Sequence, residues 1–297
     1  MNLVHGVELD AERKPAWLRF GMLGLLYRLY GTRTAEPSVQ AWLARLHSDV
    51  FRHYVSHFQQ CFYKFDRAAG HAARCRDAAD GAINRFSERA RQGKEQPFSR
   101  SDRRLIDEIN MDLPIFLDAM FFYLRIQADT FAELVTFFYP GRDRDLISSD
   151  SFRTQRKWFI KRDPNFDPEY TAILLANSEW FDLLAGDIPK GLRDVIVHHK
   201  GMLQVGWAKP ADGPIEPRTA LYRRDGVREE NVFAALRKIT TGWFAFLDAS
   251  WRHFVPRLAE AGILATKFVN NLETTRWEDY RRRELASLWV YPTSADA

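Results

Sequence analysis

The sequence predicts an all-α protein, a helical bundle built around a pair of long helices. Apolar side chains recur at intervals of three and four residues, as at Val39, Trp42 and Leu46 and then at Val50 and Tyr54. That spacing lines one face of a helix. Strand-like alternation is brief, and a chain of 297 residues with 46% hydrophobic content is long enough to bury a substantial core.

Helices are expected along most of the chain, with caps and breakers at their ends. The stretch "SRSDRRLIDE" offers Ser and Asp as N-caps for the longest helix, and Pro114 inside that helix is expected to kink it or restart it. The expected helical ranges are 16–31, 39–58, 71–91, 99–139, 169–184, 188–200, 229–261 and 274–289.

The breaker "GKEQP" is the best candidate for a domain boundary. It separates an N-terminal helical region, residues 1–95, from a helical core with a C-terminal helix, residues 96–297. Within the second region, "QVGWA" and "TALYRR" flank a Pro/Gly-rich loop and are consistent with one short β-hairpin.

Composition favours a cytoplasmic protein without membrane spans. Two cysteines argue against a disulfide framework, and charged residues such as Asp118, Arg125 and Asp129 interrupt the most apolar run. The net charge of +4 and a pI near 9.0 permit contact with nucleic acid. No Walker loop, GxGxxG, HExxH, nucleophile elbow or CxxC is present, and no cofactor is expected.

The segment "IPKGLRDVIVHHKG" carries the main candidate for catalytic chemistry. Arg193 offers a fork of donors suited to phosphate, and His198 or His199 titrates near neutral pH, as acid–base catalysis requires. Asp194 lies four residues before His198, so on a helix its carboxylate shares a face with the imidazole. Arg193 and His198, however, lie about 140° apart around a regular helix. A shared active site therefore needs a distorted helix end or a second copy of the chain.

Spacing alone gives this motif little weight. About 2.7 Arg/His pairs with four to six intervening residues are expected by chance, and three occur. Arg193 accounts for two of them, and Arg52 with His57 in "RHYVSH" is the third. If Asn, Asp or His must directly follow the arginine, the number of matches expected by chance falls to about 0.35. The sites at Arg193 and at Arg52 both still match. The alternative is that Arg193 and the histidines are cations near a helix C-terminus, where positive charge stabilises the helix dipole.

The stretch "GLRDVIVHHKG" resembles the R-[N/D/H]-x3-H signature of the HEPN family of prokaryotic helical domains. In that family the motif lies on a late helix after a long helix pair, which is the order expected here from about Ser99 to Leu258. The resemblance implies a metal-independent endoribonuclease that acts as a homodimer, with paired motifs in one cleft.

Carried over to this chain, the resemblance implies that Arg193 binds the scissile phosphate. It implies that His198 activates the ribose 2′-OH or protonates the leaving oxygen, with His199 competing for that role and Asp194 filling the polar second position. The expected setting is a toxin or phage-defence system, with RNA as substrate and an antitoxin or defence protein as partner. The alternatives are a non-catalytic module on the same fold that binds RNA, a nucleotide or a protein, and a structural subunit that docks a partner.

Two further patterns are candidates for binding. The segment "FRTQRKWFIKR", expected to be a loop, interleaves cations for phosphates with rings for stacking bases, or else forms a solvated face over a packed apolar side. His57 with Cys61 and His71 with Cys75 would form a zinc site only if a hairpin near Asp66 brought them together, and the helix-forming sequence between them argues against it. The stretch "FRTQRKWFIKR", residues 152–162, is called the basic segment below. Its candidate RNA-binding residues are Arg153, Arg156, Lys157, Trp158, Lys161 and Arg162.

Overall fold

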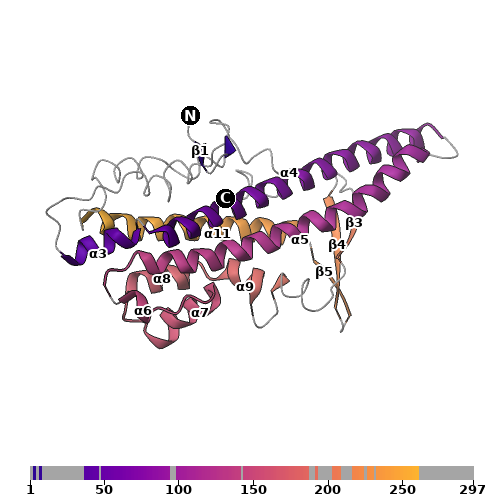
Figure 1. Ribbon diagram of the computed structural model, residues 1–297. Helices are drawn as coiled ribbons and strands as arrows, with labels where there is room; N and C mark the ends of the chain where they lie inside the picture. Colours follow the sequence, from indigo (N-terminus) through magenta and orange to yellow (C-terminus); the bar gives the residue numbers. More distant parts are fainter. Residues whose placement is uncertain are drawn as a thin grey trace.

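Two long antiparallel helices form the axis of the molecule (Figure 1). Helix α4 (Asp49–Arg91) begins at Ser48, whose hydroxyl accepts a hydrogen bond from the Phe51 amide at 3.2 Å. Helix α5 (Arg100–Phe137) begins at Ser99, which accepts from the Asp102 amide at 3.0 Å. The computed structural model describes residues 3–4, 7–8, 37–46, 48–93, 98–141, 143–186, 191–192, 203–208, 216–223, 226–230 and 232–260.

The long helices differ from expectation at two points. The ranges 39–58 and 71–91 are not separate helices, because a short helix α3 (Pro37–Leu46) ends before Ser48 and α4 then runs unbroken. Helix α5 continues through Pro114. Leu113 and Leu117 on either side of the proline are fully buried, so packing holds the helix together where the missing N–H would weaken it.

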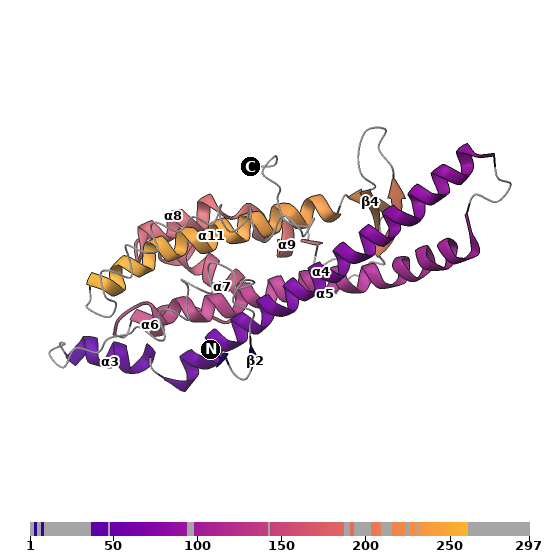
Figure 2. The same cartoon turned by 90° about the horizontal axis from the view of Figure 1, so that it is seen from above.

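A third long helix and several short ones complete the wide end of the bundle. Helix α11 (Val232–Glu260) lies beside α4 and α5 (Figures 1 and 2). The expected helix 169–184 is divided into α8 (Pro168–Ala176) and α9 (Glu179–Ala185). The basic segment expected to be a loop is instead helical, with α7 (Phe152–Lys157) running into a π-helix, η2 (Trp158–Arg162), and α6 (Asp143–Leu146) precedes it.

Aromatic side chains dominate the core where α4, α5 and α11 meet. Trp243 lies 6.2 Å from Phe58 and 5.8 Å from Phe131, measured between ring centroids. Its indole N–H donates to the Gln127 side chain at 2.9 Å, so the buried polar group is satisfied. One continuous cluster of buried residues spans positions 42–72 and 113–258.

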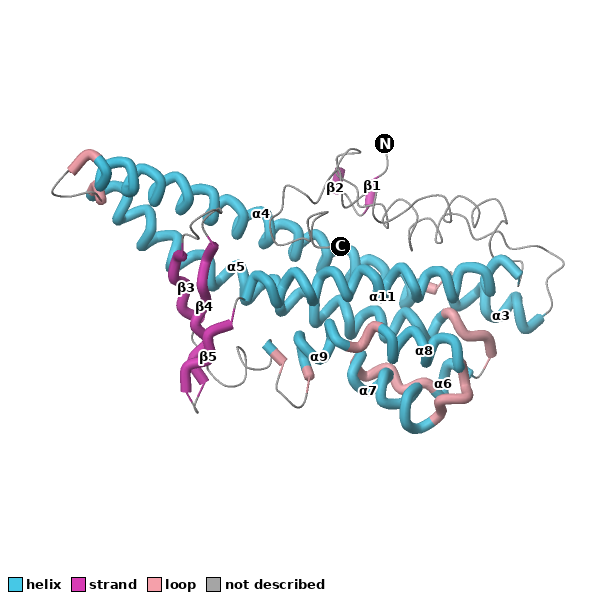
Figure 3. The backbone as a smooth tube through the Cα atoms, turned by 180° about the vertical axis from the view of Figure 1, so that it is seen from behind, coloured by secondary structure: helices cyan, strands magenta, loops and turns pink. Residues whose placement is uncertain are grey.

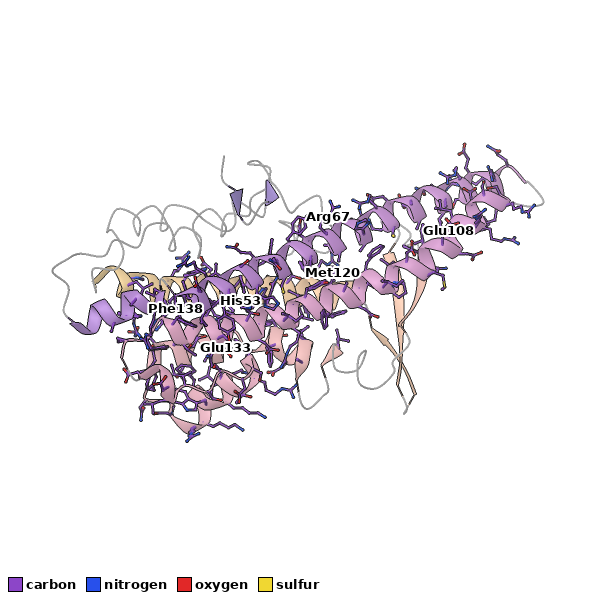
Figure 4. The ribbon with its side chains drawn as sticks, viewed as in Figure 1. His53, Arg67, Glu108, Met120, Glu133 and Phe138 are labelled. Carbon is purple, nitrogen blue, oxygen red and sulfur yellow. The ribbon has the colours of Figure 1, made fainter. Side chains whose placement is uncertain are left out.

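The boundary expected near residue 95 lies at the turn between α4 and α5. Because the buried cluster draws residues from both sides of that turn, the described chain shows one shared core there rather than two separate cores. Beyond the cluster, α4 and α5 continue side by side away from α11 as a two-helix arm, defined here as residues 73–93 and 98–112 (Figure 2). Figure 4 labels Glu108 in this arm and Phe138 just past the other end of α5.

A small antiparallel sheet lies beside α5 near the base of the arm (Figure 3). The expected hairpin is confirmed as β3 (Leu203–Ala208) paired with β4 (Glu216–Arg223), and a third strand, β5 (Gly226–Glu230), extends it. The Trp207 indole donates to the Asn110 side chain of α5 at 2.9 Å. Two-residue strands β1 (Leu3–Val4) and β2 (Val7–Glu8) pair near the N-terminus.

Among the described helices, none combines the length and the apolar character that crossing a membrane requires.

Candidate functional site

The four candidate catalytic residues lie outside the described residues. Between positions 187 and 202 the structure describes only Gly191 and Leu192. The geometry of Arg193, Asp194, His198 and His199, and with it the distance between the arginine and the histidines, therefore stays a prediction.

The two described residues fix where the motif begins. The Gly191 amide donates to the Gly186 carbonyl at 3.0 Å, and Leu192 is buried as part of the main core cluster. A Cβ atom at position 191 would lie 2.3 Å from the backbone nitrogen of Ala185, so only glycine allows this approach to the last turn of α9. Arg193 thus directly follows a residue anchored in the core beside α9.

The aromatic rings of the basic segment are not surface groups. Phe152 is 2% exposed, Trp158 is 6% exposed and Phe159 is fully buried. Phe152 packs against Trp180 and Phe181 of α9, with centroids 5.3 and 4.9 Å away. The expected stacking of bases on these rings, Trp158 included, is therefore wrong for this conformation, because the apolar spacing of the segment serves the core instead.

The cations of the same segment divide into two groups. Arg153 donates to the Ala185 carbonyl, and Arg156 makes a bidentate pair with Asp182 at 2.7 and 3.1 Å. Both acceptors belong to α9, so these two arginines hold α7 against it. The second group, Lys157, Lys161 and Arg162, is exposed to solvent.

Helix α7 is also held against α5 by the carboxylate of Asp129, which pairs with Arg125 on α5 itself. Arg125 donates to the Asp129 carboxylate at 2.9 Å, as expected for residues four apart, and its guanidinium lies 5.1 Å from the Phe181 ring centre. The other Asp129 oxygen accepts from the Phe152 amide at 2.9 Å, at the start of α7. One side chain of α5 therefore sets the position of the basic segment.

A buried carboxylate, Asp167, is the centre of the largest polar network in the described chain. One oxygen accepts from the Tyr139 hydroxyl at 2.9 Å, from His253 Nε2 at 2.8 Å and from Arg257 at 2.6 Å. The other accepts from the Tyr170 amide at 3.0 Å and so caps α8. Asp167 is 2% exposed, and it joins the end of α5, the start of α8 and the last turns of α11.

The protonation states in this network suit a role in stabilising the fold rather than in acid–base catalysis. Burial alone would raise the pKa of Asp167, but hydrogen bonds from His253 and from the Tyr170 amide outweigh it, so the pKa lies well below its usual range. Burial, reinforced by the Asp167 charge, raises the pKa of Tyr139 far above its usual range. Asp167 and Tyr139 therefore each keep one protonation state near neutral pH, whereas a general acid or base needs a pKa close to the working pH.

His253 lies between two carboxylates. Its Nε2 faces Asp167 at 2.8 Å, and its Nδ1 faces Glu169 at 3.3 Å. The ring therefore links α11 to the N-cap and the first turn of α8. Nothing in the sequence signalled the network, because Asp167 and His253 are 86 residues apart and belong to no motif.

The zinc alternative is excluded by the continuity of α4. His57, Cys61, His71 and Cys75 all lie on this one helix, so the hairpin that would join the two pairs does not form. His57 instead contacts the Thr130 hydroxyl at 3.2 Å, and His71 stacks on Phe116 at 4.9 Å. The described residues contain no group of three or more side chains arranged to hold a metal ion.

The second Arg/His match has structural roles. Arg52 pairs with Asp49 at 3.5 Å, while His57 lies next to Thr130 of α5. Burial lowers the pKa of His57, and His53 lowers it further.

Comparison of the chain with protein-family models, curated proteins and solved structures found no match.

Proposed function

We propose that this chain is a HEPN-like endoribonuclease that acts on RNA in the cytoplasm without a metal ion. The observation that carries the proposal is that the basic segment and the start of the candidate catalytic segment both pack against α9. Arg153 and Arg156 bond to the last turns of that helix, and Leu192, directly before Arg193, is anchored beside it. The basic segment and the start of the candidate catalytic segment thus share one rigid support.

The proposed reaction is an in-line attack by the ribose 2′-OH on the adjacent phosphate. His198 or His199 removes the hydroxyl proton or protonates the leaving 5′-oxygen, and Arg193 stabilises the negative charge on the phosphorane. The products are a 2′,3′-cyclic phosphate and a 5′-hydroxyl end. Asp194, four residues before His198, orients the imidazole.

The proposal includes a homodimer, because Arg193 and His198 lie on different sides of a regular helix. A two-fold axis would bring the arginine of one copy to the histidine of the other. We further propose a toxin or phage-defence role, with an antitoxin or another defence protein holding the activity in check.

The test is RNA cleavage by purified full-length protein and its variants. Arg193→Ala and His198→Ala should each lower the cleavage rate by about 100-fold or more while leaving the helical circular dichroism unchanged. Arg52→Ala is the matched control, since Arg52 belongs to the other Arg/His match and should leave the rate unchanged. Full activity in both motif variants would overturn the assignment.

A second candidate is a non-catalytic RNA-binding module on the same fold. It is favoured by the exposure of Lys157, Lys161 and Arg162, which does not depend on the motif. This candidate predicts that wild-type protein binds RNA but does not shorten it, and that Arg193→Ala leaves binding unchanged.

A further inference from the structure

One short segment of the chain carries a strong local excess of positive charge. Residues 152–163 contain five cations and one carboxylate, Asp163, a net charge of +4. The whole chain of 297 residues also carries a net charge of +4, so the rest is balanced overall. A local excess of this kind attracts polyanions.

The π-helix determines which way these cations point. Arg162 follows Phe159 by three residues and Gln155 by seven. In a regular α-helix this spacing would place Arg162 on the same face as these two fully buried side chains. The turn is instead closed by a bond from the Asp163 amide to the Trp158 carbonyl at 3.0 Å, five residues back. The extra residue in the turn moves Arg162 to the outside.

The result is three exposed cations next to each other along the helix. Lys157, Lys161 and Arg162 are all exposed, while the rings of Trp158 and Phe159 fill the core beneath them. In the part of the chain that the structure describes, neither Lys161 nor Arg162 forms a salt bridge with a carboxylate. Arg156, by contrast, is already engaged by Asp182.

We propose that Lys157, Lys161 and Arg162 form a phosphate clamp that holds the backbone of single-stranded RNA without reading its bases. The clamp rests on the proposed function, since it would deliver RNA to the segment that follows α9. Phosphate contacts fix the register of a nucleic acid, whereas sequence is read by contacts to bases, and the rings that would provide them here are buried. The clamp therefore accepts RNA of any sequence.

Arg153 and Arg156 have a different role in this proposal. They are positioning residues, because their bonds to Ala185 and Asp182 hold the clamp at a fixed place relative to α9. The clamp does not contact the 2′-OH, so DNA should bind to it as well. A DNA oligonucleotide is then expected to inhibit RNA cleavage competitively without being cleaved.

The clamp is tested by fluorescence anisotropy with full-length protein carrying His198→Ala, so that bound RNA is not consumed. The probes are labelled oligouridylate, oligoadenylate and oligodeoxythymidylate of equal length. Adding Lys161→Gln and Arg162→Gln should weaken binding to all three about tenfold or more. It should also reduce the slope of log affinity against log salt by about 0.7 per lost phosphate contact.

Two controls make the result specific. Arg100→Gln with Arg103→Gln removes the same charge from exposed positions on the first turn of α5 and should leave affinity unchanged. Lys161→Arg with Arg162→Lys should retain binding. Unchanged affinity in the Lys161/Arg162 glutamine variant would overturn the clamp, as would equal weakening in the Arg100/Arg103 control or a tenfold preference between oligouridylate and oligoadenylate.

The clamp and the nuclease can fail separately. Cleavage that needs Arg193 but not Lys161 or Arg162 would remove the clamp and leave the nuclease. Binding that needs Lys161 and Arg162 without any cleavage by wild-type protein would retain the clamp and support the non-catalytic module.

Discussion

The body of the molecule, defined here as the part built on the buried cluster of residues 42–72 and 113–258, and the arm each contain one buried aspartate that joins several elements, and the two aspartates differ in what they join. In the arm, Asp102 accepts from Ser99, Arg85 and Arg89, and the most distant partner is 17 residues away along the chain. In the body, Asp167 accepts from Tyr139, His253 and Arg257, which are 28, 86 and 90 residues away. Asp102 therefore joins two neighbouring helix ends, whereas Asp167 joins three elements that are distant in sequence.

The apolar packing differs in the same way. The arm face of α4 is lined by small buried residues, Ala73, Ala79 and Ala82, which let α5 approach closely but bury little area each. The body buries large rings such as Trp243 and Phe131, which contribute far more apolar area per residue. The comparison indicates that the stability of the fold resides in the body and that the arm is the weaker unit.

The largest expected effect comes from Asp167→Asn. The change takes the shared carboxylate from His253, whose side chain is 3% exposed, and from Arg257, whose side chain is 40% exposed and can be partly rehydrated, so we expect a loss of about 3 kcal/mol. Urea denaturation of the two proteins measures the difference in unfolding free energy. A loss no larger than that caused by Asp102→Asn would contradict the contrast between body and arm.

The same variant should reveal an acid-sensitive contribution. Because the folded-state pKa of Asp167 is depressed, its stabilisation is complete above the unfolded-state pKa of about 3.9 and is lost as the pH falls through the folded value. The difference in unfolding free energy between wild type and Asp167→Asn should therefore stay constant from about pH 7 to about pH 5 and shrink as the pH falls below about 4. Urea titrations at several pH values test this, and a difference that also stays constant in acid would exclude the linkage.

A pair of glycine substitutions tests the packing contrast. A Cβ at position 242 would lie 2.5 Å from Cβ of Trp180, so Gly242→Ala should force α11 away from α9 and destabilise the body by about 1–3 kcal/mol. Gly70, on the part of α4 leading into the arm, meets no atom closer than 3.8 Å. Gly70→Ala should instead stabilise by about 0.5–1 kcal/mol through helix propensity. Thermal unfolding should show shifts of opposite sign.

Asp102→Asn should have a smaller, local effect. The Asp102 side chain is buried, but the side chains of Arg85 and Arg89 are 49% and 32% exposed. Water can therefore replace much of the hydrogen bonding that the two arginines lose with the carboxylate. We expect a loss of about 1 kcal/mol. Hydrogen exchange should speed up in the arm, while α8 and α11 keep wild-type protection. Faster exchange spread evenly over body and arm would show that the arm is not an independent unit.

The part of the fold that depends on nearby residues could be predicted from the sequence. The all-α bundle, the Ser99 cap and the short hairpin all follow from spacings of a few residues, and all are present. The unbroken α4 and the passage of α5 through Pro114 depend on packing between helices, which local propensity does not report.

The site was predicted less well for the same physical reason. The basic segment was correctly identified as cation-rich, but the burial of Trp158 and the π-turn follow from how the segment packs on α5 and α9. The Asp167 network depends on partners 86 and 90 residues away, which no local pattern encodes. The motif from Arg193 to His199 lies outside the described residues and remains a prediction from the sequence.

The central claim is tested most directly by the ends of the RNA fragments that wild-type protein makes in the presence of EDTA. The proposed reaction predicts fragments with 2′,3′-cyclic phosphate and 5′-hydroxyl ends, formed at the same rate with and without the chelator and lost in Arg193→Ala. Fragments with 5′-phosphate ends, cleavage that EDTA abolishes, or the absence of cleavage would contradict it.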